Sequence, residues 1–452
     1  MTESVHKGVS PSLELEKLII DKKVSKWESV LLHLVVFALL LPSAWQSISA
    51  GLLGLTFLFQ KGYRSNVWSS EVGMLFRKTL TFLALAWVCL MVLAVLDDMR
   101  GGEIKPYIRL LGKQGLWGSV TIAAIIYFQF TRTRNFLNLK ILLGFTSLLL
   151  VYCVVQRYTG IDWVHGFSGK LGMNRYAYDV YRVSGWMDHP LTFSFNLMLV
   201  TLISVAECFY VFKRGFQKEA YLWATQTGLL LTLLLLTDSR FPIALTFALI
   251  LLAAIWEFRK FRIPAISFLF VLLIAGALTL PNLPPEKIGR WGELVNSNQP
   301  LEQRFDRLIF WKINWELFKE SPWSGTGLKA YDGRLLDTYL SAGYTNLERK
   351  YNAHNIYLQT LADTGALGGL GLSLLLIGLG RLAFRVKRRF EHIALPLIVL
   401  ATLGSGLVQN NLRDTEYLFA LWISIGLSLS WLIVQGKPDD RGSEQQLEDL
   451  KP

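Results

Sequence analysis

The sequence predicts an all-α polytopic membrane protein with about twelve transmembrane helices and one large, partly helical loop on the outer face. Three observations support this fold class: long apolar runs, the placement of Lys and Arg between them, and one long hydrophilic stretch. Of the 452 residues, 52% are hydrophobic, and a helix needs roughly 17–25 apolar residues to cross a bilayer. The runs near that length are residues 27–43, 44–60, 77–96, 114–131, 138–156, 190–212, 220–238, 241–257, 263–281, 356–380, 392–410 and 417–435.

The two ends of the chain are expected to be cytoplasmic. Residues 1–26 are polar and mix Glu with Lys, which does not fit a cleavable signal peptide, so the first span would itself act as the insertion signal. The first two runs are separated only by Pro42-Ser43, which leaves eleven spans as an alternative. The charged segment 436–452 reads as a cytoplasmic tail.

Basic residues set the orientation. With both ends inside, every inner loop carries a Lys/Arg cluster, as the positive-inside rule requires. The net charge of +12 then follows from topology and contact with anionic membrane lipids, and does not indicate nucleic-acid binding. The clusters are Lys17/Lys22/Lys23/Lys26, Arg132/Arg134/Lys140, Lys213/Arg214/Lys218, Arg259/Lys260/Arg262 and Arg385/Lys387/Arg388/Arg389.

Polar residues inside the spans are few. Cys89, Cys153 and Cys208 lie far apart within spans and are expected to be core residues, not a disulfide framework or a metal cluster. Glu207 is a functional suspect because it lies inside a span. Pairing at the helix end, near Lys213, or snorkelling explains it equally well.

Residues 282–355 lie between the nine spans within 27–281 and the three spans within 356–435. They form an outer segment that is too long for a simple connector. An amphipathic helix is expected over 301–320, ended by Ser321-Pro322. Arg304 and Arg307 fall near one face of that helix. Its apolar stripe is expected to consist of Leu301, Phe305, Leu308, Trp311, Trp315 and Phe318.

His354 ends this outer segment, immediately before the next span. Imidazole titrates near neutral pH, so it can remove a proton from a sugar hydroxyl; the plainer interpretation is a helix cap. Arg240 lies between two spans with almost no loop, and it joins Arg304 and Arg307 as a candidate for diphosphate binding, since guanidinium groups bind phosphate in bidentate fashion. Snorkelling or ordinary solvation are the plainer interpretations of these arginines.

Two further outer features carry weaker signals. Asp97-Asp98 could serve as a base with a divalent metal, as in many membrane glycosyltransferases, although a solvated loop start explains the pair better. Arg182 and His189 lie in Arg182-Val183-Ser184-Gly185-Trp186-Met187-Asp188-His189-Pro190, which also reads as a turn leading into a span.

Four motifs, in this order, resemble the O-antigen ligase family, within the wider group of O-antigen ligases, O-antigen polymerases and bacterial O-oligosaccharyltransferases. The resemblance covers roughly residues 175–380, and the N-terminal spans match only in hydropathy. The motifs are Thr237-Asp238-Ser239-Arg240, Arg307-Leu308-Ile309-Phe310-Trp311, Ser321-Pro322-Trp323-Ser324-Gly325-Thr326-Gly327, and His354-Asn355-Ile356-Tyr357-Leu358 through Thr364-Gly365-Ala366-Leu367-Gly368.

The resemblance implies a bacterial inner-membrane glycosyltransferase of the GT-C type, facing the periplasm, with no metal and no cofactor. It would move a glycan from undecaprenyl diphosphate onto an acceptor. His354 would be the base, and Arg240 with Arg304 or Arg307 would hold the diphosphate; Arg307 fits the Arg-x-x-x-Trp spacing better. Arg182 matches a basic diphosphate-binding position less clearly.

The acceptor does not follow from the motifs. A ligase delivers O-antigen to lipid A-core in lipopolysaccharide synthesis, a polymerase to another lipid-linked unit, and an O-oligosaccharyltransferase to protein Ser or Thr. We favour the ligase. A transporter of lipid-linked glycans would place its charged groups near the bilayer midplane, whereas here they gather at the outer edge. A structural scaffold for glycan assembly is a third interpretation, and it predicts tolerance of substitutions at His354 and Arg240.

Overall fold

A computed structural model describes residues 26–59, 71–113, 117–130, 138–164, 181–258, 306–344 and 352–435. The expected span 263–281, Arg304 and the two terminal segments lie outside these residues. The described helices are α2 (Lys26–Ala38), α3 (Ser43–Phe59), α5 (Glu71–Asp98), α6 (Lys105–Leu111), α7 (Trp117–Phe130), α8 (Leu139–Thr159), α9 (Pro190–Lys213), α10 (Gln217–Leu236), α11 (Arg240–Glu257), α16 (Asp306–Glu320), α17 (Tyr331–Ser341), α18 (Ile356–Phe390), α19 (Ala394–Gly406), the 3-10 helix η6 (Asn411–Arg413) and α20 (Thr415–Gln435).

The chain is a multi-pass helical membrane protein. Among the described residues, six helices are long and apolar enough to cross a bilayer: α5, α8, α9, α10, α11 and α18. The runs expected at 392–410 and 417–435 form the shorter apolar helices α19 and α20. α18 continues to Phe390, so its cluster from Arg385 to Arg389 lies on the helix and not in a loop. Cations there suit the negative end of the helix dipole.

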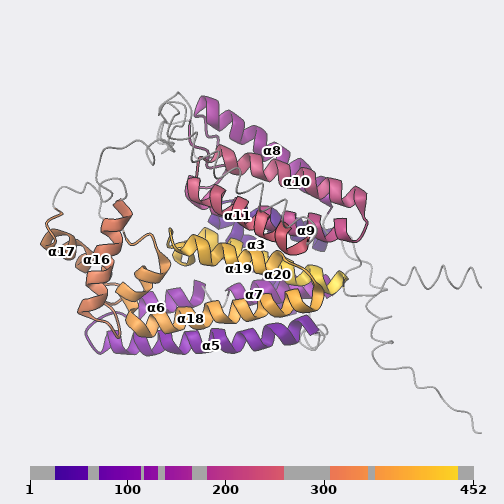
Figure 1. Ribbon diagram of the computed structural model, residues 1–452. Helices are drawn as coiled ribbons and strands as arrows, with labels where there is room; N and C mark the ends of the chain where they lie inside the picture. Colours follow the sequence, from indigo (N-terminus) through magenta and orange to yellow (C-terminus); the bar gives the residue numbers. More distant parts are fainter. Residues whose placement is uncertain are drawn as a thin grey trace, which may run out of the picture.

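The bundle is built around α9, the most deeply buried of the candidate spans. α9 packs against α10, α19, α11 and α20, while α18 packs along α5. Figure 1 shows α16 and α17 at one end of this bundle, beside the first turns of α18. The helices at the periphery of the bundle expose apolar side chains such as Val88, Val151 and Phe247, as expected of surfaces that face lipid.

Glu207 has a different partner from the one expected. Its carboxylate lies 2.8 Å from Nε2 of His392, and both side chains are buried. Lys213 instead binds Glu257 at 2.7 Å, and Lys387 contacts the same carboxylate. Because α9 packs on α19, the residue that leads into α19 reaches Glu207, whereas Lys213 lies one and a half turns further along and faces α11.

α16 lies within the helix expected over 301–320, and the expected apolar stripe is only partly buried. Leu308 and Trp315 are 38% and 46% exposed. The residues that are buried against α17 and α18 are Phe310, Ile313, Asn314 and Leu317. A helix between two partners buries the face that meets them, so Leu308 and Trp315 face outward while Trp311 and Phe318 are half-buried.

α18 has a break in its helical geometry where the turn after α16 packs against it. Gly365 has φ 63° and ψ −165°, a combination open essentially only to glycine. Gly325, in the turn after α16, also has positive φ and lies against the backbone of Asp363 and Thr364. A Cβ on Gly365 would come within 2.4 Å of the carbonyl carbon of Trp323. The two segments therefore meet backbone to backbone.

Four hydrogen bonds close this junction, and a buried polar network lies beside it. The bonds run from the N–H groups of Thr326, Gly327, Ala366 and Leu367 to the carbonyls of Ala362, Asp363, Pro322 and Trp323, respectively. In the network, Gln359 of α18 donates to Asp363, whose carboxylate lies 2.5 Å from the Arg413 guanidinium. Tyr331 of α17 lies between Asn314 and Gln359. Buried polar groups paired in this way specify one relative position of α16, α17 and α18.

We predict that Gly365→Ala destabilises the fold by about 2–4 kcal/mol, because it adds both a forbidden backbone conformation and a clash with backbone atoms. The measurement is the thermal unfolding midpoint of the purified protein in detergent. Gly380→Ala is the matched control: it lies in the same helix and its Cβ would meet nothing within 4 Å. Equal midpoints for the two variants would contradict the junction's importance.

Candidate functional site

His354 lies in a short loop that leads directly into α18. Its φ is 42°, in the left-handed region that few non-glycine residues adopt. Its N–H donates to Asn352 Oδ1 at 3.0 Å. Asn355 then caps α18 by accepting from the N–H groups of Tyr357 and Leu358. These local bonds hold the loop in the conformation that presents the imidazole.

The end of α19 fixes this loop from the other side. Asn355 Nδ2 donates to the carbonyl of Leu407, and the Tyr357 hydroxyl donates to that of Leu403. Gly406 lets the helices approach, since a Cβ there would come within 2.7 Å of Ile356. The loop that carries the candidate base is therefore anchored to two helices, α18 and α19.

Gln409, just after α19, contacts the imidazole itself. Its Oε1 lies 3.1 Å from Nδ1 of His354. An amide oxygen can only accept, so Nδ1 carries the proton and Nε2 is the unprotonated nitrogen. Sequence reasoning missed Gln409, because 55 residues separate it from His354. The one available signal was a polar Gln-Asn-Asn run between two apolar helices.

Burial lowers the pKa of His354 below its usual value. The Gln409 hydrogen bond opposes this shift, and the positive charge of Arg307 adds to it. A proton on a half-buried imidazole beside a guanidinium is disfavoured. His354 is therefore neutral near pH 7 and able to accept a proton.

Arg307 approaches His354 from α16. Burial lowers its pKa, yet a guanidinium stays charged. One helical turn further along, the ring of Phe310 lies 6.0 Å from the His354 ring. α16 thus brings Arg307 near His354, their shared role in a functional site stays a prediction, and Arg304 lies outside the described residues.

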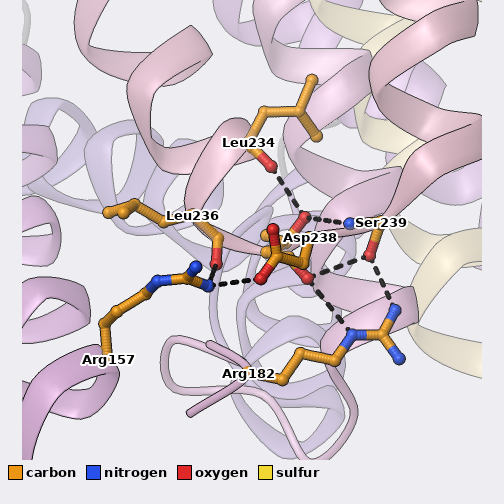
Figure 2. A network of polar contacts seen from close by, with 7 residues as sticks. Arg157, Arg182, Leu234, Leu236, Asp238 and Ser239 are labelled. Carbon is orange, nitrogen blue, oxygen red and sulfur yellow. Dashed lines mark hydrogen bonds and ion pairs between the residues drawn. The ribbon is translucent and has the colours of Figure 1, made fainter. Parts of the chain in front are cut away.

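Arg240 begins α11, directly after a tight turn from α10. Asp238, at the centre of that turn, has a positive φ of 51°. Arg157 at the end of α8 donates to Asp238 at 2.6 Å and to the carbonyl of Leu236 at 3.1 Å (Figure 2). A second arginine binds the other side of the turn: Arg182 donates to the Thr237 carbonyl and to Ser239 Oγ.

These contacts bear on the predicted role of Arg182. Two of its N–H groups hold the turn that carries Arg240, so the described contacts make it a supporting residue there. Arg157 has the same supporting role, and it was not predicted, since its partner lies 81 residues away in the chain.

His189 lies near enough to Arg182 and His354 for both residues to influence its pKa. It caps α9 by accepting the N–H of Leu191 at Nδ1. Its pKa is lowered first by burial, then by the charge of Arg182 and by His354, while Asp414 acts the other way. The N-terminal ends of α9, α11 and α18, which carry the partial positive charge of the helix dipole, lie at one end of the bundle. Arg182, Arg240 and Arg307 lie at the same end. Such an arrangement favours an anion.

Asp97 and Asp98 differ in how far they are exposed to solvent. Asp98 is exposed, whereas Asp97 is half-buried and packs against the turn after α16: a Cβ on Gly327 would come within 2.5 Å of its Oδ1. Asp97 is therefore not a solvated loop residue, because the junction at α18 brings that turn onto the end of α5. In the ranges that the structure describes, no three His, Cys, Asp or Glu side chains converge to hold a metal ion. A metal-free reaction stays a prediction.

The arrangement can hold an anion and remove a proton beside it. The same part of the chain matches a known family: residues 227–373 fit the O-antigen ligase family model. This match includes Arg240, Arg307 and His354 and covers about a third of the chain. A comparison with curated proteins finds no match. Residues 227–373 are therefore similar to the O-antigen ligase family.

Proposed function

We propose that this protein is an O-antigen ligase: an inverting, metal-independent glycosyltransferase of the GT-C type. It would transfer O-antigen polysaccharide from undecaprenyl diphosphate to a sugar hydroxyl of lipid A-core, at the periplasmic face of a bacterial inner membrane that it crosses about twelve times. The observation that carries the proposal is the position of His354, whose Nδ1 lies 3.1 Å from Oε1 of Gln409, beside the cationic Arg307. The family match supports the class of reaction.

In this mechanism Nε2 of His354 accepts the proton of the acceptor hydroxyl. The hydroxyl oxygen attacks the anomeric carbon of the donor while the bond from that carbon to the diphosphate oxygen breaks. Attack from the side opposite the leaving group inverts the configuration. The bonding electrons pass to the diphosphate, whose growing negative charge Arg240 and Arg307 stabilise. The Nδ1–H bond to Gln409 stabilises the imidazolium that forms.

Arginine suits this task better than lysine. Its planar fork binds two phosphate oxygens at once and keeps its charge when half-buried, as Arg307 is. Arg240 is held in place by the turn that Arg157 and Arg182 bind. Direct contact of Arg182 or Arg304 with the diphosphate stays a prediction.

We expect His354→Ala to lower the rate of glycan transfer at least about 100-fold, because a positioned general base contributes about that much. The assay combines the purified protein, lipid-linked O-antigen and lipid A-core, in the presence of EDTA. Offering a lipid-linked repeat unit and a Ser/Thr peptide in parallel identifies the acceptor class. Full activity of the variant, or loss of wild-type transfer in EDTA, would sink the metal-free mechanism with His354 as base.

Arg240→Lys and Arg307→Lys should each reduce donor use about tenfold while leaving the unfolding midpoint unchanged, since a point charge cannot reproduce the bidentate fork. Transfer rate against donor concentration is the measurement. Arg334→Lys is the matched control: Arg334 lies on α17, is exposed and pairs with Glu320. A similar loss in the control would argue against a specific diphosphate site.

Variants of Gln409 should move the pH profile of transfer in opposite directions. The base must be unprotonated, so the rate falls as pH drops through the pKa of His354. Gln409→Leu removes the interaction that raises this pKa, so the acid limb moves to lower pH and the maximal rate falls as the tautomer is lost. Gln409→Glu adds a negative charge, so the acid limb moves to higher pH. A profile that is unchanged in both variants would leave Gln409 with a purely structural role.

A further inference from the structure

A second site lies far from His354, between α5 and α18. The two helices pack along each other, and Figure 1 shows them side by side along one edge of the bundle. A pocket of ≈ 250 Å³ opens between them, lined by Lys78 of α5 and by Arg381 and Arg385 of α18. At 1.5 Å per residue, Lys78 is about 30 Å from Asp98, at the outer end of α5. The pocket therefore belongs to the opposite leaflet.

The pocket is positively charged, and its cations have no anionic partner among the residues that the structure describes. No carboxylate is among the described residues that line it. Within the described part of the chain, Lys78, Arg381 and Arg385 form no ion pair. The contrast with Lys213 and Lys387 at the same end is clear, because those two lysines share Glu257. The side chain of Thr81, also in the lining, adds a hydroxyl that can donate to an anion.

The packing of the two helices shapes the pocket. Gly378 lets α18 approach α5 closely, since a Cβ there would come within 2.7 Å of Phe82 Cβ. The guanidinium carbon of Arg381 lies 5.5 Å from the centre of the Phe82 ring, within reach of a cation–π interaction. This contact restrains Arg381 at the pocket, whereas a snorkelling side chain would extend away into water.

Apolar side chains continue from the pocket toward the middle of the bilayer. Leu85 lies two turns beyond Lys78 on the same face of α5 and is 48% exposed. Ile377 lies one turn from Arg381 on α18 and is 51% exposed. A ligand that fits both parts has an anionic head and an apolar tail.

We propose that this pocket binds the phosphate of an anionic phospholipid, in the leaflet opposite the candidate site, with an acyl chain lying along Leu85 and Ile377. Basic pockets between spans are typical sites for anionic lipid headgroups. The proposal rests on the membrane-spanning fold and not on the glycan-transfer reaction. The apolar surface beside the pocket favours a lipid over free phosphate.

Native mass spectrometry of the full-length chain tests the proposal. Phosphatidylglycerol should be retained at least about tenfold better than phosphatidylcholine, and excess inorganic phosphate should not displace it. The triple variant Lys78→Gln/Arg381→Gln/Arg385→Gln should lose this preference. Arg77→Gln/Lys218→Gln/Arg388→Gln removes the same charge from positions outside the pocket lining at the same end of the bundle, and should weaken binding by only about twofold.

Equal retention of the two lipids, equal losses in the two triple variants, or displacement by phosphate would overturn the proposal. A second measurement needs no variant and so does not depend on its folding. Phosphatidylglycerol with a photoreactive acyl chain should label wild-type peptides that contain Leu85 or Ile377. Labelling confined to other helices would also overturn it.

Discussion

The contact between two glycines, Gly325 and Gly365, is the constraint on which the candidate site depends. It lets the turn after α16 lie directly on the backbone of α18, with four hydrogen bonds across the junction. α18 begins next to His354, and α16 carries Arg307. The relative position of the candidate base and one candidate anion-binding residue is therefore set by this backbone packing together with the buried polar network beside it.

The other side of the site is built by side-chain hydrogen bonds. Arg157 and Arg182, from two different segments, hold the turn before Arg240, and Gln409 holds His354. Each contact joins residues that lie far apart in the chain. Each also involves either a charged arginine or the imidazole of His354. α8, α10, α11 and α18, which lie next to these residues or carry them, are candidate spans, so the membrane fold itself supplies the rigidity that the site needs.

Hydropathy and basic clusters were sufficient to predict a helical membrane protein, and the short motifs singled out Arg240, Arg307 and His354 as candidates whose roles stay predictions. The buried face of α16 could not be predicted that way, because Trp315 and Leu308 are apolar whether they face a partner helix or the outside. The pairing of Glu207 with His392 was not predicted, since His392 approaches through the packing of α9 on α19. The roles of Gln409 and Arg157 could not be predicted, because single-sequence patterns carry little information on contacts between distant segments.

The turn between α10 and α11 has a mechanical consequence. With only Thr237, Asp238 and Ser239 between the two helices, Arg240 cannot shift along the membrane normal unless both helices move with it. An anion bound to Arg240 is thus held at one depth relative to the bundle. In a thicker or thinner bilayer the lipid headgroups would change level while this arginine would not, so bilayer thickness would set the height at which a lipid-borne anion meets it.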